Sequence, residues 1–205
     1  TIFNKGIEKY PAYYFVGFLI FEFFATATQT SLTTLKDNSS LLIKSKLPRE
    51  LFILSRVLTA FVNFLLGCIP FAAVLAWYRA AVTIYYFMIP VVLLLLLIFT
   101  TGMSYLVSIW FVFQRDARNI YSNFIFILRF FVAMFYSVDW VADGVKWVIQ
   151  HNPLYAYIYV MRQCVVYGRM PEGMYITQMF AWAIGMFGFG ILIFKKYENE
   201  VVERL

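Results

Sequence analysis

The sequence has 205 residues, of which 62% are hydrophobic and only 14% are charged, and its mean hydropathy is +0.74. A soluble domain of this length needs a charged exterior, which this composition excludes. The formal net charge of +6 resides mainly in the connections between apolar stretches, so no nucleic-acid partner is needed to explain it. We predict an integral membrane protein.

Five apolar stretches follow one another along the chain. A helix rises about 1.5 Å per residue, so a hydrocarbon core of about 30 Å needs roughly 20 apolar residues. Only Glu22, in the first stretch, and Arg129, in the fourth, place a charge at membrane depth. We predict an all-α polytopic membrane protein, one transmembrane domain over residues 1–205, with five transmembrane helices at about 11–34, 51–77, 84–113, 120–138 and 173–194.

The first connection, residues 36–50, carries a short run that can form a helix. Asn38 or the serines after it can cap such a helix, and Pro48 should end it, because the residue before a proline avoids the helical region. Two interpretations stay open at this point. The run is either a solvated loop that supplies topogenic charge or a docking helix for a cytoplasmic partner.

Residues 139–168, between the fourth and fifth stretches, do not read as a polar loop. Two short apolar helices are predicted, separated by a break at His151, Asn152 and Pro153 and ended by Gly168. Neither helix is long enough to span a bilayer. A re-entrant or interfacial hairpin is therefore predicted.

Lys and Arg are unevenly distributed between the two sets of connections. Residues 36–56, 114–120 and 195–205 carry ten of them, whereas the opposite side carries six over a longer length of chain. Cytoplasmic loops are enriched in these residues. The three basic connections, and with them the C-terminus, are predicted to face the cytoplasm.

Two features of the apolar regions suggest function. Glu22 and Arg129 can pair across the first and fourth spans, line a polar conduit separately, or lie near an interface and snorkel. Aromatic side chains gather at the predicted outer side, among them Trp140, Trp147 and Tyr159. They form either an aromatic belt at headgroup level or a stacking surface for sugar rings.

The sequence offers few groups for catalysis. His151 is the only histidine, and neither a metal-binding motif nor a phosphate-binding loop of the G-x-x-x-x-G-K-[ST] type occurs. We therefore expect this chain to hydrolyse no ATP itself and to be no enzyme, and we expect no metal or cofactor in it.

Three stretches carry a resemblance to a known family. They are residues 38–50 (NSSLLIKSKLPRE), 113–119 (FQRDARN), and 145–154 (VKWVIQHNPL) with 167–169 (YGR). In this order and spacing the chain resembles the permease subunits of ABC-2 type exporters of lipid-linked polysaccharides, the group that handles teichoic acids, O-antigens and capsular polymers. Leu47 stands where the family usually has an aromatic residue before Pro-Arg-Glu.

The resemblance implies a sixth span before Thr1, a homodimer, and two copies of a cytoplasmic ABC ATPase that binds ATP and Mg. It implies a multi-pass protein of the bacterial cytoplasmic membrane that moves a lipid-linked glycan and contacts membrane lipid. It assigns a coupling helix to the ATPase, with the residues Ser39, Ser40, Leu41, Leu42, Lys44, Lys46, Leu47, Pro48, Arg49 and Glu50. The hairpin would be the outer gate, with an aromatic surface formed by Trp140, Trp147, Asn152, Pro153, Tyr155 and Tyr159.

Two other functions remain open at the level of sequence. An ABC-2 exporter of drugs or small lipophiles would share the topology. A membrane enzyme acting on lipid-linked sugars would differ in mechanism, since it would be active without an ATPase. The scarcity of catalytic groups disfavours the enzyme, and the docking helix disfavours a channel.

Overall fold

The computed structural model describes residues 9–44, 47–78 and 83–204, and within these ranges the chain is helical and has no strand. The elements in chain order are α1 (Tyr10–Asp37), α2 (Ser39–Lys44), α3 (Glu50–Trp77), the 3-10 turn η2 (Ile84–Phe87), α4 (Met88–Phe113), α5 (Ala117–Leu128), the 3-10 turn η3 (Val138–Trp140), α6 (Asp143–Gln150), α7 (Pro153–Arg162), the π-turn η4 (Gln163–Tyr167) and α8 (Gly173–Arg204). The prediction of an all-α membrane protein is confirmed.

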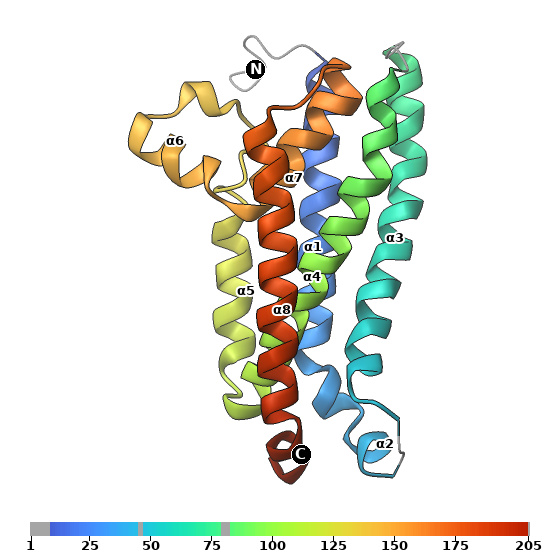
Figure 1. The fold of residues 1–205 in the computed structure, drawn as a ribbon, viewed down its shortest axis with the longest axis vertical. Coiled ribbons are helices and arrows are strands. Elements are labelled where there is room, and N and C mark those ends of the chain that lie inside the picture. Colours follow the sequence, from blue (N-terminus) through green and yellow to red (C-terminus); the bar gives the residue numbers. More distant parts are fainter. Residues whose placement is uncertain (1–8, 45–46, 79–82, 205) are drawn as a thin grey trace.

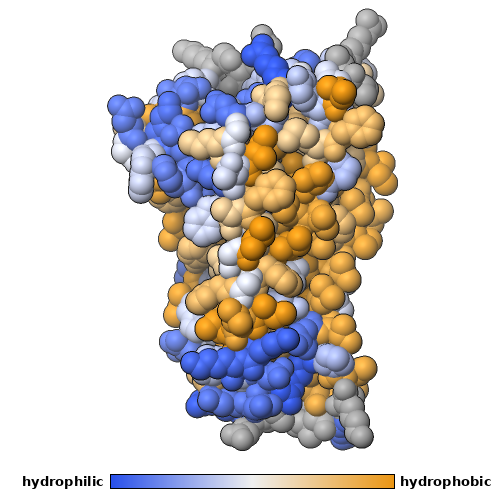
Figure 2. Space-filling view, viewed as in Figure 1, coloured by the Kyte–Doolittle hydropathy of each residue, from blue (hydrophilic) through white to orange (hydrophobic). Residues whose placement is uncertain are grey.

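Within the described residues, four helical segments are long and apolar enough to cross a membrane. They are α1, α3, the continuous run of η2 and α4, and α8, with 28 to 30 residues each. They coincide with four of the five predicted spans. Figure 2 shows hydrophobic side chains over the middle of the molecule and hydrophilic ones gathered toward its two ends, as a bilayer-spanning bundle requires.

The fourth predicted span, residues 120–138, differs from the prediction. The helix α5 has 12 residues and ends at Leu128, so it covers only about 18 Å at 1.5 Å per residue. Residues 129–137 then leave the helical path, and Ala133 adopts a left-handed φ of 47°. A count of apolar residues cannot detect this change, because it does not test whether the helix continues.

The helix α1 is the centre of the bundle and packs against α3, α4, α5 and α7. In its most apolar window 67% of the residues are buried, against 17% in α8. α8 instead packs along α4, where Gly102 faces Gly190 so closely that a Cβ on Gly190 would collide with the Gly102 carbonyl. Two backbones can approach this closely only where side chains are absent.

The bundle has two distinct ends (Figure 1). At one end lie α2, the start of α5 and the C-terminus, which are the three basic connections of the sequence. We call it the α2 end. At the other end, η3, α6, α7 and η4 form a folded-back segment, Val138–Tyr167, which we call the hairpin, and α6 projects sideways from the bundle.

Candidate functional site

The described residues from Ser39 to Glu50, which we call the α2 segment, present apolar side chains to the solvent at the α2 end. Leu42 is buried and packs in a cluster with Leu35 and Ile53, whereas Leu41 is 55% exposed and Leu47 57% exposed. Ser40, Lys44 and Pro48 are exposed, and Ser39 is half-buried. Of the predicted coupling residues, Lys46 lies outside the described residues. The segment therefore has one anchored leucine and two available ones.

Arg49 ties this segment to the far end of the chain. Its Nη1 donates to the Glu198 carbonyl at 2.6 Å and lies 3.3 Å from the Asn199 Oδ1, both on α8. The next residue, Glu50, is the first residue of α3, where its carboxylate interacts favourably with the positive end of the helix dipole. Arg49 thus fixes the start of α3 to the C-terminal part of α8.

Glu22 and Arg129 form an ion pair between α1 and the end of α5. The Arg129 Nη2 lies 2.9 Å from the Glu22 Oε1, and the two side chains are 39% and 37% exposed, respectively. The guanidinium also lies 5.3 Å from the centre of the Phe21 ring. Of the arrangements open to the sequence, the structure thus has the pair, and a role in a conduit stays a prediction.

Residues 130–136 are non-helical, and side chains satisfy most of their carbonyl groups, with every donor except Tyr136 coming from outside this segment. In each pair a backbone carbonyl accepts from a side chain: Phe130 from Tyr136, Phe131 from Asn152, Ala133 and Met134 from Arg162, Phe135 from Tyr10, and Tyr136 from Tyr13. Irregular backbone at membrane depth requires partners of this kind, since hydrocarbon supplies none. These hydrogen bonds are the physical reason why α5 can end early.

Arg162 is the central residue of this arrangement, and the sequence analysis missed it as a site residue. Only 3% exposed, it donates from Nε to the Tyr13 carbonyl at 3.1 Å and from its other nitrogens to Ala133 and Met134. Its guanidinium also stacks on the Tyr13 ring, 3.4 Å from the ring centre. Counted along the sequence, it was one more charge on the outer side. Its spacing from Tyr155 and Tyr159 on one helical face was the available signal.

The break between α6 and α7 lies where the sequence predicted it. The Asn152 side chain accepts from the Leu154 N–H at 3.0 Å and so caps α7, with Pro153 in the first turn. Its amide nitrogen donates to the Phe131 carbonyl at 3.1 Å. Asn152 and Pro153 therefore join the hairpin to the end of α5 and fix the start of α7.

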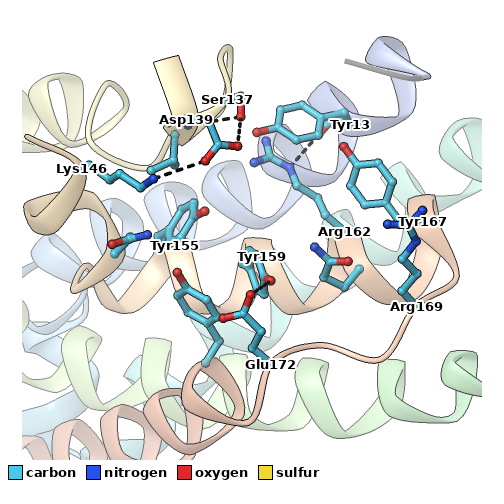
Figure 3. A pocket seen from close by; sticks show the side chains of 14 residues that line it. Tyr13, Ser137, Asp139, Lys146, Tyr155, Tyr159, Arg162, Tyr167, Arg169 and Glu172 are labelled. Atoms are coloured by element: carbon cyan, nitrogen blue, oxygen red, sulfur yellow. Dashed lines mark hydrogen bonds and ion pairs between the residues drawn. The ribbon is translucent and has the colours of Figure 1, made fainter. Parts of the chain in front are cut away.

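A pocket of about 450 Å³ opens beside the hairpin (Figure 3). We call it the hairpin pocket. Its lining residues are Tyr13, Ser137, Val138, Asp139, Lys146, Gln150, Tyr155, Tyr159, Arg162, Gln163, Tyr167, Arg169, Glu172 and Tyr175. One wall is a single face of α7, because residues 155, 159 and 162 are spaced by four and three positions. η3 and α6 form the opposite wall.

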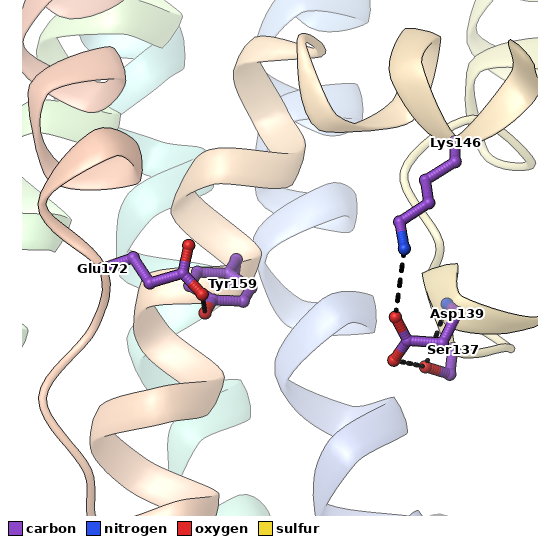
Figure 4. A network of polar contacts seen from close by, with 5 residues as sticks. All are labelled: Ser137, Asp139, Lys146, Tyr159 and Glu172. Atoms are coloured by element: carbon purple, nitrogen blue, oxygen red, sulfur yellow. Dashed lines mark hydrogen bonds and ion pairs between the residues drawn. The ribbon is translucent and has the colours of Figure 1, made fainter. Parts of the chain in front are cut away.

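Polar contacts hold the carboxylates of the hairpin pocket in place (Figure 4). The Tyr159 hydroxyl donates to Glu172 at 2.9 Å. Across the pocket, Asp139 accepts from the Ser137 hydroxyl at 3.1 Å and pairs with Lys146 at 3.4 Å. In the second pair the Asp139 side chain is 80% exposed, so the pair positions the groups more than it stabilises the fold.

The predicted outer aromatic surface is divided in the structure. Tyr155 and Tyr159 lie in the hairpin pocket, where their rings form a cluster with Tyr175. Trp140 and Trp147 are not among the lining residues and are 47% and 62% exposed. Tyrosine is thus the only aromatic residue type among the described residues that line this pocket, and Trp147 lines a separate pocket with His151.

Comparison with known proteins agrees with this architecture. Residues 2–166 match the family described as ABC-2 type transporter. The chain is 25% identical over 200 residues to the O-antigen export system permease protein RfbA of Klebsiella pneumoniae, which covers 97% of this chain and 77% of that protein. It is 24% identical over 208 residues to the protein of the same name from Myxococcus xanthus, covering 100% of this chain and 80% of that protein. The chain belongs to the ABC-2 type transporter family, as a membrane-embedded transport subunit.

Proposed function

We propose that this chain is the membrane-spanning subunit of an ATP-driven exporter that carries a lipid-linked polysaccharide across the bacterial cytoplasmic membrane. Membership of the ABC-2 family supports an ABC ATPase as the partner. The relatives named as O-antigen export permeases favour a polymer of the O-antigen class, with teichoic acid and capsular polymers as members of the same chemical group.

The observation that carries the proposal is the exposed α2 segment. A soluble partner with an apolar groove can bury Leu41 and Leu47, while Leu42 stays fixed in the bundle. The α2 end also carries the basic connections, which favours a cytoplasmic position for it and for the C-terminus. ATP and Mg would be bound by the partner, whose two copies would engage two copies of this chain.

The structure suggests how ATP binding reaches the membrane. Closure of the ATPases would displace α2, and the Leu42 cluster and Arg49 would pass this displacement to α3 and α8. Because α1 follows directly into α2, the central helix would move as well. The glycan would then pass along the interface between the two protomers.

The proposal is tested by purifying the complete protein gently from its own cells and weighing the intact complex. We expect two copies of this chain with two copies of a P-loop ATPase. Leu41→Glu should reduce the recovered ATPase at least tenfold, because a charge buried in an apolar groove costs more than about 1.4 kcal/mol. Lys195→Glu, an exposed charge change at the same end, is the control and should retain the ATPase.

Each other outcome has a distinct meaning. Equal recovery of ATPase with Leu41→Glu and Lys195→Glu would contradict docking through α2. Recovery without any ATPase, under conditions that preserve other transporters, would overturn the exporter and favour a membrane enzyme. A retained glycolipid mass would support the polysaccharide class, whereas a retained small lipophile would favour a drug exporter.

A further inference from the structure

The hairpin pocket lies at the end of the bundle opposite α2, so docking of the ATPase does not account for it (Figures 1 and 3). Its volume of about 450 Å³ falls within the range of roughly 300–1,000 Å³ that is typical of small-ligand sites. The question is which chemistry its walls can recognise.

The walls offer hydrogen-bond acceptors and donors in similar measure. Two carboxylates, Asp139 and Glu172, face three cations, Lys146, Arg162 and Arg169, and tyrosine hydroxyls and the amides of Gln150 and Gln163 complete the lining. A lipid tail would bind poorly here, because it would remove water from these polar groups without offering them new hydrogen-bond partners. A ligand with many hydroxyls, each both donor and acceptor, satisfies them.

A phosphate group fits the pocket less well than a sugar. The most deeply buried cation, Arg162, already directs its nitrogens at three backbone carbonyls. Lys146 is paired with Asp139, and the Glu172 carboxylate would repel an anion. Carboxylates held by Tyr159 and Ser137, in contrast, retain lone pairs for the hydroxyl groups of a saccharide.

The recognition groups are also held ready before a ligand arrives. The rings of Tyr155 and Tyr175 are 6% and 4% exposed, and Tyr159 lies against Tyr175 with ring centres 4.1 Å apart. Packed rings lose little conformational freedom on binding. Because the Tyr159 ring is packed, its hydroxyl holds the Glu172 carboxylate in a fixed position.

We propose that the hairpin pocket binds a short saccharide segment of the exported glycan at the end of the bundle where the polymer leaves. The inference rests on the proposed function and adds a glycan site distinct from the path between protomers. Glu172 and Asp139 accept hydrogen bonds from sugar hydroxyls, and Tyr159 positions Glu172.

The experiment uses the complete permease purified with its ATPase. The probe is an oligosaccharide released by mild acid from the surface polysaccharide of the source cells, and its binding is measured by saturation-transfer NMR and titration calorimetry. Wild type should bind it. Glu172→Gln and Tyr159→Phe should each weaken binding about tenfold, the scale of a lost hydrogen bond to a charged group.

Asp143→Asn is the matched control. It makes the same change from acid to amide on an exposed residue of α6 that does not line the pocket. It should bind as wild type does. Thermal unfolding of all variants, measured in the same detergent, separates loss of binding from loss of fold.

The outcomes separate this inference from the proposed function. Equal affinity of wild type, Glu172→Gln and Tyr159→Phe, or no binding by wild type in a preparation that retains its ATPase and exports glycan, would overturn the saccharide site alone. Displacement of the oligosaccharide by low millimolar inorganic phosphate would likewise overturn it in favour of an anion site. A preparation without ATPase or export would contradict the proposed function itself.

Discussion

At the scale of single residues, the Arg162 side chain replaces hydrogen bonds that a longer α5 would form. The carbonyls of Ala133 and Met134 would bond to N–H groups further along α5 if that helix continued, and the guanidinium takes this role instead. Gly17 makes room for it, because a Cβ there would lie 2.9 Å from the Arg162 Nη2. Among the described residues no carboxylate forms an ion pair with Arg162. Its charged guanidinium therefore stabilises backbone carbonyl groups through hydrogen bonds.

We expect Arg162→Met to destabilise the protein by about 3 kcal/mol or more, because it removes several hydrogen bonds to a charged group and leaves buried carbonyls unsatisfied. Thermal unfolding in detergent measures the effect. Arg169→Met, which removes an exposed arginine seven residues further along, is the control and should change stability by no more than about 0.5 kcal/mol. Equal melting temperatures for the two variants would contradict the assigned role.

At the scale of elements, α4 and α8 form the closest pair of helices. Their backbones meet at Gly102 and Gly190. The glycines of α8 differ in their surroundings. Within the described part of the chain, no atom lies within 4 Å of a Cβ placed on Gly185 or Gly188. Only one side of α8 uses its small residues for packing against α4.

The same substitution should therefore have opposite effects at two positions of α8. Gly190→Ala should destabilise the protein by about 1–3 kcal/mol, since the new methyl group collides with backbone that cannot rotate away. Gly188→Ala should be neutral or stabilising by up to about 1 kcal/mol, because alanine favours the helix. Thermal unfolding of the monodisperse proteins gives both values. A Gly190→Ala variant as stable as Gly188→Ala would refute the close crossing.

Local chemistry predicted the short elements of the hairpin better than it predicted α5. Asn152 and Pro153 mark the start of a helix by capping and by a fixed φ, and both act within a few residues. The pocket could be predicted only in part. Tyr155 and Tyr159 were predicted to belong to an aromatic surface. Glu172, which directly precedes α8, and Tyr175, which lies on α8, were not predicted as site residues. Only the fold brings them beside α7.

The end of α5 could not be predicted because its cause is remote. Arg162 and Tyr13 lie 28 or more positions along the chain from the residues they bond at 133, 134 and 136, and these hydrogen bonds compete with the helical ones. Helix length rules consider only the segment itself. Glu22 and Arg129 were recognised as a possible pair, since charges at membrane depth seek partners.

At the scale of the whole molecule, the two ends have different chemistry. The α2 end offers two exposed leucines, one on the short helix α2 and one after it, and the hairpin end offers a polar pocket. α1 and α8 each run between the two ends, and Arg49 connects the start of α3 to α8. Continuous helices therefore join the proposed docking segment to the proposed saccharide site.

Arg49→Gln should weaken this connection without removing α2. Losing hydrogen bonds worth about 1–2 kcal/mol lowers the population of the anchored state by a factor of about 5–30. The ATPase should still bind, while glycan exported per ATP hydrolysed in proteoliposomes falls at least fivefold. Lys195→Gln, an exposed substitution on α8, should leave this ratio unchanged. An unchanged ratio for Arg49→Gln would exclude the anchor from coupling.

The Arg49 anchor also has a consequence for biogenesis. Arg49 and Glu198 are 149 residues apart in the chain, so the contact forms only after α8 has been synthesised and inserted. Until then the α2 segment lacks one of its fixed points, although α1, α2 and α3 already exist. The surface at the α2 end is therefore complete only once α8 is in place. A partner that requires this surface would bind finished chains in preference to nascent ones.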